Sequence, residues 1–317
     1  MTTLTVIDAD SIIFTIAWKF RNKKSSNFVK MATDEFIKSV LDANNTDAYI
    51  GYYALKDAEG IRPNFRYNID PKYKANRPDT PDFVKKWRGV IHEKFKNKWG
   101  FISIDGMEAD DAVTFTVEHY RNDYDKIVVA TFDKDLKQIP NIEYYNMKTH
   151  KSELIDELTA ATFFYTQMLV GDSGDNIKGV PGIGKVTAKN LLKDKTTKAQ
   201  LHSAVARQYK IYGDKKTNQE IKKIKDSIAE TINSETYPNL TPAQLDRKIR
   251  IELKKRNSEI FDWKKYFKQQ TVLLQMLTTS PDWFTIPSPI EYQVLNKVGD
   301  NMLDDFLNET DEINTTL

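Results

Sequence analysis

Carboxylates gather at a few places in this sequence, in most cases directly after a short apolar run. The set is Asp8, Asp57, Glu108, Asp110, Asp111, Asp133, Asp135, Asp172 and Asp175. Open α/β sheets bind their ligands at the carboxyl ends of the strands, which is where most of these acids are expected to lie. A single Asp is more often a helix cap or a loop residue, and we interpret Asp10 as a cap. The joint pattern is what indicates a site.

The chemistry of these side chains indicates which cation they would bind. Converging carboxylates repel one another and raise each other's pKa, so a fold tolerates them mainly where a cation neutralises them. The chain has no cysteine, which excludes disulfides, Cys-based zinc sites, iron–sulfur ligation and a cysteine nucleophile, and its four histidines lie far apart. All-oxygen ligands favour Mg²⁺ or Mn²⁺ over zinc. Two such ions roughly 4 Å apart suit phosphodiester hydrolysis.

A second motif, Gly179–Leu192 (GVPGIGKVTAKNLL), combines glycines with lysines. We interpret it as a helix, a tight Gly-Ile-Gly hairpin and a second helix, in which Gly182 and Gly184 let backbone N–H groups approach a phosphate. Lys185 and Lys189 add positive charge on one helix face. A lone GxG would indicate only a turn, but the full spacing favours contact with the DNA backbone, which carries no sequence information.

A third motif, Tyr73–Arg77 (YKANR), is a short basic patch beside an aromatic residue. Lys74 and Arg77 are candidates to contact the scissile phosphate and to stabilise developing charge, and we place Tyr73 in the same DNA-contacting group. On their own, these five residues describe a solvated loop better. The segment from Pro78 to Trp99 then has the pattern of an amphipathic basic helix, and such a stripe more often faces a core.

The elements that position these residues alternate in the first half of the chain. Strands are predicted at Leu4–Asp8, Tyr49–Leu55, Phe101–Ile104, Lys126–Thr131 and Glu143–Met147, with a helix at Ala109–Tyr120. This alternation predicts an α/β fold with a parallel or mixed sheet covered by helices. After about residue 158 the strand signals stop, and the pattern is mainly helical to about residue 277.

Length and composition set the frame for these motifs. The chain has 317 residues, which suggests two domains, and 40% hydrophobic residues, which excludes wholesale disorder. The net charge of +2 conceals segregation, because acids cluster at strand ends while bases crowd residues 193–268. This segregation indicates an acidic site beside a polyanion-binding face. No apolar run is long enough to span a membrane and the N-terminus lacks a basic leader, so we expect a cytoplasmic protein.

Together these motifs resemble the structure-specific 5′ nuclease family, which includes flap endonucleases, phage 5′–3′ exonucleases and the 5′-nuclease domain of bacterial DNA polymerase I. In family order they are VIDADS, YKANRPDTP, GMEADD, TFDKDL and GDSGDNIKGVPGIGKVTAKNLL, spanning roughly residues 4–192. The resemblance implies a PIN/Rossmann-like mixed sheet, a helical arch over the active site, and a helix–hairpin–helix module that binds duplex DNA, often with K⁺ on its hairpin carbonyls.

The resemblance also implies roles for individual residues. The acids matched to a first metal ion are Asp8, Glu108, Asp110, Asp111 and Asp133, and those matched to a second are Asp135, Asp172 and Asp175. Asp57 matches the remaining acid on less distinctive flanking sequence, and Lys74 and Arg77 match the basic pair at the base of the arch. The implied cofactors are two Mg²⁺ ions, for which Mn²⁺ can substitute, and K⁺ at the hairpin.

We expect three parts in the chain. These are an α/β nuclease core over 1–158 with the arch at about 74–106, a helical domain over 159–285 with the helix–hairpin–helix at about 171–192, and a C-terminal tail over 286–317. The arch segment looks short, Lys185 is followed by Val186 where the family has a second base, and the stretch 196–280 is longer than the resemblance explains.

The tail contains one apolar island, Asp300–Leu307 (DNMLDDFL). It resembles a sliding-clamp-binding peptide, with Leu303, Phe306 and Leu307 as anchors and Asp300 in place of the usual Gln. An apolar island in an acidic tail is typical of a segment that folds on binding. A helix docked on its own protein accounts for the island equally well.

The resulting hypothesis is a monomeric Mg²⁺-dependent 5′ nuclease acting on DNA with a 5′ flap, nick or single-stranded end. RNA in an RNA/DNA duplex also fits, because attack by water needs no 2′-hydroxyl. The sequence leaves open the balance of exonuclease and flap endonuclease activity. One alternative is a non-catalytic duplex-DNA-binding replication accessory, although no carboxylate of the set is missing. Another is a single-stranded RNA nuclease, against which the hairpin argues.

Overall fold

The computed structural model describes residues 2–55, 64–233, 241–256, 260–282 and 284–292. Its strands are β1 (Thr3–Asp8), β2 (Ala48–Ala54), β3 (Ile102–Ile104), β4 (Lys126–Thr131), β5 (Ile142–Asn146), β6 (Lys151–Ile155) and β7 (Ile290–Glu291). Its helices are α1 (Asp10–Lys19), α2 (Ser26–Ala43), α3 (Arg66–Ile69), α4 (Asp82–Asn97), α5 (Ala109–Tyr120), η1 (Lys134–Gln138), α6 (Glu157–Val170), α7 (Lys185–Leu192), α8 (Lys198–Asn233), α9 (Pro242–Lys255) and α10 (Trp263–Leu274).

The sheet is mixed, as predicted, with the strand order β3-β2-β1-β4-β5-β6. Strands β1 to β5 are parallel to their neighbours, while β6 is antiparallel to β5 and β7 is antiparallel to β2. Strand β1 is central and fully buried, which its apolar run of residues requires. The chain runs outward from β1 to β3 and then crosses back to β4, so the strand order reverses between β1 and β4. Ligand sites form beside such a switch point.

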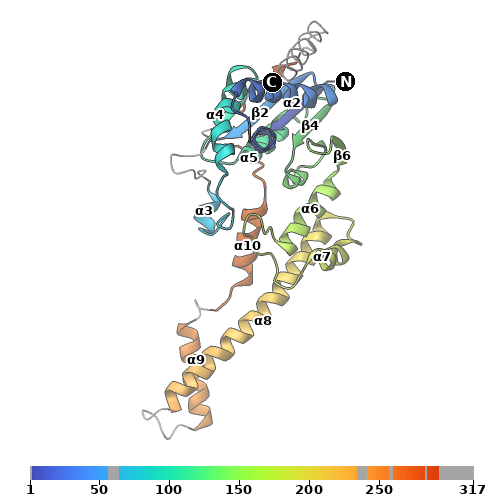
Figure 1. Cartoon of the computed structure of the whole chain (residues 1–317). Coiled ribbons are helices and arrows are strands. Elements are labelled where there is room, and N and C mark those ends of the chain that lie inside the picture. The colour runs from blue at the N-terminus through green and yellow to red at the C-terminus, as the bar shows by residue number, and fades with distance from the viewer. Residues whose placement is uncertain (1, 56–63, 234–240, 257–259, 283, 293–317) are drawn as a thin grey trace.

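Helices cover both faces of this sheet (Figure 1). Helices α1, α2 and α4 pack on one face, in a core that includes Ile7 and Val128. Helix α5 packs on the other face, in a core that includes Leu4 and Val129. The two cores fix the ends of β1, β4 and α5, which carry the acidic residues.

The segment expected to form an arch does not stand free. Its helix, α4, buries Val84, Trp87, Ile91 and Phe95 against α1 and α2. These residues recur every three or four positions, so one apolar stripe faces the core. The prediction of an arch over 74–106 is therefore wrong for this helix, and the core-facing alternative is confirmed.

Two strands were not predicted from the sequence. Strand β6 is an edge strand whose first four residues are exposed, so it lacks the apolar run that marked the other strands. Strand β7 pairs with β2, and the backbone N–H of Tyr292 donates to the carbonyl of Asp47. Residues 286–292, assigned to the tail, therefore belong to the sheet and its cover, where Ile286 also packs.

The helical part has two separate cores. The larger lies between α6, α7, α8 and α10 and includes Met168, Leu192 and Tyr209. The smaller lies where α9 packs on α8 and is centred on Ile224. Helix α9 begins with a Thr241/Gln244 capping box, which supports a helix that buries little surface. Among the described helices, none has both the length and the apolar content to cross a membrane.

Candidate active site

The ends of β1 and β4 bring the first acids together. Asp8 is the last residue of β1, and its carboxylate accepts hydrogen bonds from Ser11 Oγ and Thr131 Oγ1, both at 2.8 Å. Thr131 ends β4, so the bond joins the two strands at the switch point. Asp133 lies two residues further on and caps η1 by accepting the Asp135 N–H at 2.8 Å.

The start of α5 adds Glu108 and Asp110 to this edge but directs Asp111 elsewhere. Glu108 and Asp110 line the same cavities as Asp133. Asp111 is fully buried and binds the Arg66 guanidinium with N–O distances of 2.8 and 2.9 Å. Successive helical side chains point about 100° apart, which separates the neighbouring carboxylates. Asp111 therefore does not line the cavities that the other described candidates line, and its assignment to the metal group stays a prediction.

A closed loop supplies Asp172 and Asp175. Asp172 and Ile177 exchange backbone hydrogen bonds of 2.9 and 2.7 Å. Gly171 and Gly179 both have positive φ, and a Cβ on either would collide with backbone of the other side of the loop. The predicted helix immediately before the Gly-Ile-Gly hairpin is thus wrong, because residues 171–184 form turns and irregular structure between α6 and α7.

The basic patch faces the acids. Lys74 Nζ pairs with Glu108 and lies 3.7 Å from Asp175 Oδ2, while the Arg77 guanidinium pairs with Asp175. Lys74 has a φ of 57°, a conformation that non-glycine residues seldom adopt and that recurs at functional sites. Its backbone N–H donates to the Asp175 carbonyl at 3.0 Å, which holds the patch against the loop.

The prediction that Tyr73 contacts DNA is wrong, because the residue is buried. Only 3% of the residue is exposed. Its hydroxyl lies 3.0 Å from Glu108 Oε2 and 3.1 Å from Asp175 Oδ2, within donating distance of both. Its ring belongs to the helical core and packs edge-on against Tyr67, with the ring centroids 5.5 Å apart. Tyr73 therefore positions two carboxylates, and only Lys74 and Arg77 reach the cavity from this motif with charged groups.

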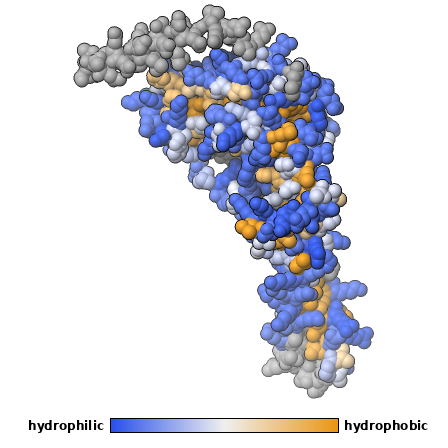
Figure 2. Space-filling view, turned by 90° about the vertical axis from the view of Figure 1, so that its right-hand side faces the viewer, coloured by the Kyte–Doolittle hydropathy of each residue, from blue (hydrophilic) through white to orange (hydrophobic). Residues whose placement is uncertain are grey.

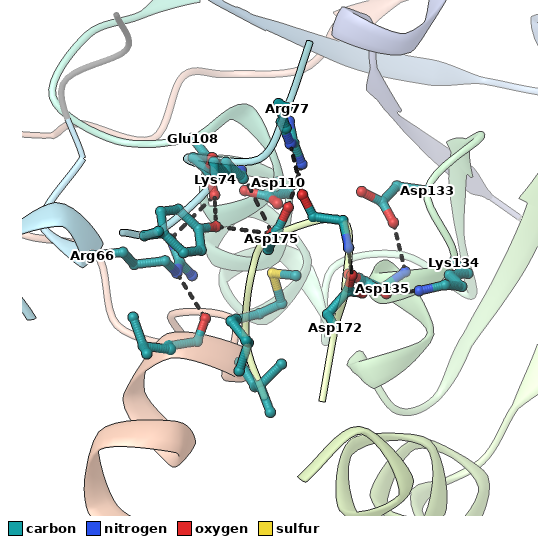
Figure 3. Close-up of a pocket in the computed structure, with 16 residues that line it drawn as sticks. Arg66, Lys74, Arg77, Glu108, Asp110, Asp133, Lys134, Asp135, Asp172 and Asp175 are labelled. Atoms are coloured by element: carbon teal, nitrogen blue, oxygen red, sulfur yellow. Dashed lines mark hydrogen bonds and ion pairs between the residues drawn. The ribbon is translucent and has the colours of Figure 1, made fainter. Parts of the chain in front are cut away.

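Two adjoining cavities of about 160 and 170 Å³ form the site, and Figure 3 shows the residues that line the first of them. Both are lined by Lys74, Arg77, Glu108, Asp110 and Asp133. One adds Asp135, Asp172 and Asp175, and the other adds Asp8 and Asp10. All the metal-binding candidates that the structure describes, apart from Asp111, thus lie at one edge of the sheet.

Three residues of this site were missed from the sequence. Asp10, interpreted as a cap, accepts the Ala54 N–H at 3.0 Å and also lines the second cavity. Lys134 lies 3.1 Å from both Asp135 and Asp172 and bridges them. Its place between Asp133 and Asp135 was a usable signal. Arg66, by contrast, has no motif around it that indicates a buried cation.

Burial and mutual repulsion raise the pKa of several of these acids. Burial, and then repulsion by Asp10, raise the pKa of Asp8 to about 7. Burial, and then repulsion by Asp133, raise that of Asp135 to about 6. Burial also raises the pKa of Asp133, and burial with repulsion by Glu108 raises that of Asp110. The site therefore concentrates more negative charge than its own cations neutralise.

Two acids show the opposite shift because they have cationic partners. Burial opposes ionisation of Glu108, but the Lys74 ammonium and the Arg66 guanidinium outweigh it and hold its pKa at about 2. Burial likewise opposes ionisation of Asp172, and the hydrogen bond from Lys134 lowers its pKa overall. Lys74 and Lys134 thus form ion pairs with Glu108 and Asp172, two carboxylates that would otherwise be available to a metal ion.

The donor set fits an oxygen-seeking divalent cation. It consists of carboxylates with no cysteine or histidine, which is the chemistry that Mg²⁺ and Mn²⁺ prefer. In the side-chain positions described, no three such groups already surround a common point that would hold an ion. Three of these carboxylates are paired instead with Lys74, Arg77 and Lys134.

The Gly-Ile-Gly hairpin lies at the surface in the helical part. Gly182, Gly184, Lys185 and Lys189 are exposed, and Val186 is 76% exposed. No atom lies within 4 Å of a Cβ added at either glycine. The N-terminus of α7 at Lys185 therefore faces open space, as contact with a phosphate requires.

Four predicted residues lie outside the described part of the chain. They are Asp57, Leu303, Phe306 and Leu307.

Comparisons with known proteins agree with this architecture. The family model for the 5′–3′ exonuclease N-terminal resolvase-like domain matches residues 3–168. A thermostable DNA polymerase I of Thermus caldophilus is 30% identical over 168 residues, which is 50% of this chain and 20% of that protein. A 5′–3′ exonuclease of Mycoplasmopsis pulmonis is 27% identical over 205 residues, covering 59% of this chain and 65% of that protein. The chain thus spans less than two thirds of either relative.

A solved structure shares the fold. The T5 D15 protein, co-crystallised with metal ions, superposes with a TM-score of 0.54 at 16% identity, over 87% of this chain and 90% of that chain. Since the family model also covers more than half of the sequence, the protein belongs to the family of 5′–3′ exonucleases with an N-terminal resolvase-like domain.

Proposed function

We propose that this protein is a Mg²⁺-dependent nuclease that hydrolyses phosphodiester bonds at the 5′ ends of DNA, in replication or repair. The observation that carries the proposal is the meeting of acids from β1, β4, α5 and the 171–179 loop beside Lys74 and Arg77. Membership of a 5′–3′ exonuclease family supports the reaction class. The proposal covers both exonuclease and flap endonuclease action, because both would use the same site.

The acids divide between two ions by position. Asp8, Glu108, Asp110 and Asp133 line the second cavity and would hold one ion, although all of these except Asp8 also line the first cavity. Asp135, Asp172 and Asp175 line the first cavity and would hold the other. Bound divalent cations supply Lewis acidity, which lowers the pKa of water and offsets negative charge on the leaving oxygen. We assign no protein side chain as general base.

Lys74 and Arg77 would bind the scissile phosphate. In the structure their charges are matched by Glu108 and Asp175, which lie in the same cavity. A phosphate that enters this cavity offers the same charge-assisted hydrogen bonds, so each cation can exchange a carboxylate for a phosphate oxygen. The released carboxylates would then be available to a cation. Substrate binding and metal binding would therefore support each other.

The hairpin would anchor the duplex away from the reacting phosphate. Backbone N–H groups around Gly182 and Gly184, the N-terminus of α7, and Lys185 and Lys189 all favour phosphate contact without base readout. K⁺ on the hairpin carbonyls is part of this proposal. The protein would act as a monomer on a 5′ flap, a nick or a single-stranded end, and RNA paired with DNA would also serve as a substrate.

The segment 300–307 is proposed as a clamp-binding peptide. Removing residues 300–317 should abolish stimulation by a sliding clamp and leave basal cleavage unchanged. Unchanged clamp binding by the shortened protein would contradict this assignment.

The experiment that tests the nuclease proposal compares matched 3′-labelled substrates in Mg²⁺ and in EDTA. They are a 5′ flap, a nicked duplex, an RNA-primed duplex and a closed single-stranded circle. Mg²⁺-dependent cutting of the first three with the circle spared would establish 5′-end specificity. Tight duplex binding without cutting in Mg²⁺ or Mn²⁺ would instead favour a non-catalytic accessory.

A further inference from the structure

Helices α8 and α9 form an arm that the proposed reaction does not use. Helix α8 begins beside α6 and α7 and runs away from the α/β part, and α9 lies beside its far end (Figure 1). The 36 residues of α8 correspond to a helix length of roughly 54 Å. The far end has its own small core, in which Leu245, Ile249 and Leu253 pack around Ile224. The arm is thus an extension of the helical part that is stabilised by its own small hydrophobic core.

This arm concentrates positive charge. Residues 198–256 contain 14 Lys and Arg against seven Asp and Glu, a net charge of +7, whereas the whole chain carries +2. The rest of the chain is therefore net acidic. The arm's visible surface is mostly hydrophilic along its edges, with apolar residues along the middle (Figure 2).

The charges on α8 are ordered along one face, which we call the basic stripe. It consists of Arg207, Lys215, Lys222 and Lys225, with Ile211 and Asn218 between them. The successive spacings of these six positions are four, four, three, four and three residues, which keeps them on one side of a helix. All six are exposed, while Leu201, Val205 and Tyr209 bury another face. From residue 207 to residue 225 the stripe extends roughly 27 Å.

The arm does not neutralise this stripe itself. Within the described residues, none of its four cations forms an ion pair, whereas Lys210 pairs with Asp214 and Arg250 with Asp246. Like charges on one helix face destabilise the helix slightly, so an external anion would relieve the repulsion. A straight row of cations on a rigid helix matches a straight, rigid row of phosphates, and duplex nucleic acid carries about one charge per 1.7 Å of its axis.

We propose that the basic stripe binds the sugar–phosphate backbone of the duplex part of the substrate, remote from the acid site. The identity of the polyanion rests on the proposed function. Contact would be independent of sequence, because lysines on phosphates carry no base readout. The duplex rather than a single strand is the partner, since a flexible strand would follow a groove with stacking residues, and the stripe offers neither.

The test measures binding of the full chain in EDTA, so that no cleavage occurs. One variant replaces Arg207, Lys215, Lys222 and Lys225 with Gln. A matched control replaces four exposed lysines of the α/β part, Lys38, Lys96, Lys148 and Lys151, with Gln. Glutamine keeps helix propensity and both variants lose the same charge, so unequal binding reports position. Circular dichroism checks that both fold.

On a duplex several helical turns long, the stripe variant should bind about tenfold more weakly than the control at low salt. The slope of log affinity against log salt should fall by about 3 to 4, because each lost phosphate contact contributes about 0.9. On a duplex of about one turn, the two variants should bind alike. Equal binding of the long duplex by both variants would overturn the proposal. An acidic protein surface would then be the remaining candidate partner for the basic stripe. Equal loss on both duplex lengths would overturn the remote placement.

The outcome is separable from that of the proposed function. If wild-type protein cuts no substrate but the stripe variant still loses long-duplex affinity, the nuclease proposal fails and the arm contact stands. If wild-type protein cuts and the stripe variant binds and cuts long substrates as the control does, the arm proposal fails alone.

Discussion

Arg66 and Asp111 form a bidentate ion pair that is almost completely shielded from solvent, behind the candidate active site. The Arg66 guanidinium also donates to the carbonyls of Leu273 and Gln275 at 3.3 and 3.1 Å, and lies 3.5 Å from Glu108. The pair therefore joins α3, α5 and the end of α10. Because Asp111 shares the first turn of α5 with Asp110, this ion pair fixes the helix end that presents Asp110 to the cavities.

Replacing Asp111 with Asn should destabilise the fold. The change removes the bidentate partner of a buried guanidinium and leaves only Glu108 at 3.5 Å, and breaking comparable buried pairs costs about 3 to 5 kcal/mol. Urea unfolding of the metal-free protein measures the loss. Asp110→Asn is the matched control, and it should retain stability but lose cleavage. If Asp111→Asn unfolds at the wild-type urea concentration and binds Mg²⁺ more weakly, the family assignment of Asp111 to a metal would be right after all.

Asp133→Ala should abolish cleavage while duplex binding persists. Asp133 lines both cavities, so its loss affects the whole acid group and not one subsite. Loss of several kcal/mol of charge stabilisation corresponds to a rate reduction of about 10²-fold or more. Single-turnover cleavage of a 5′ flap measures the rate and gel shift in EDTA measures binding. Near-normal turnover would remove Asp133 from the active site.

Lys74→Met should lower the cleavage rate more than the affinity. Lys74 is the cation that pairs with Glu108 in the cavity, and we expect it to stabilise charge that develops on the phosphate. Removing one preorganised donor typically lowers kcat by about 10²-fold. Duplex affinity should change little, since the proposed hairpin and arm contacts lie away from the reacting phosphate. Lys72→Met is the control, because Lys72 is exposed and does not line the cavity. A pure rise in KM would assign Lys74 to substrate binding alone.

The metal-free protein should lose stability as the pH rises from about 4 to 7. The folded-state pKa of Asp8 is raised from 3.8 to about 7, first by burial. Between those values the folded protein retains a proton that the unfolded chain has lost, so ionisation favours unfolding. Asp8→Asn removes this effect and should raise the free energy of unfolding by about 1 to 3 kcal/mol at pH 8. Melting curves at pH 4 and pH 8 in EDTA test this, and an equal effect of the substitution at both pH values would contradict it.

The sequence located the site well where local pattern alone decides position. Asp8 and Asp133 follow apolar runs that are typical of buried strands, and parallel strands place their carboxyl ends at one edge of a sheet. The α5 boundaries were predicted to the residue, because the acids that open the helix and its apolar pattern agree. These features need no knowledge of distant contacts.

Other features depended on contacts between distant segments. Whether Asp110 or Asp111 faces the cavity is decided by Arg66, which lies 45 residues away and carries no motif. Tyr73 is buried in the helical core, and its hydroxyl meets Glu108 and Asp175, which lie 35 and 102 residues away. The 171–184 segment is not helical because the backbones at Gly171 and Gly179 meet in a narrow neck. None of these relationships leaves a periodic signal in the sequence.

Gly184→Val should weaken duplex binding without unfolding the protein. Gly184 has a φ of −93°, which a β-branched residue adopts readily, and no atom lies within 4 Å of the added Cβ. Stability should therefore change by less than about 1 kcal/mol, the usual range for an exposed substitution. If backbone N–H groups at the start of α7 contact a phosphate, the valine side chain stands between them and the oxygen. We expect about a tenfold loss of duplex affinity, with cleavage of short substrates retained.

Gly89→Val is the control, since Gly89 also has open space around its Cβ but lies on α4. If Gly184→Val binds duplex DNA as tightly as Gly89→Val and the wild-type protein do, the hairpin is only a turn.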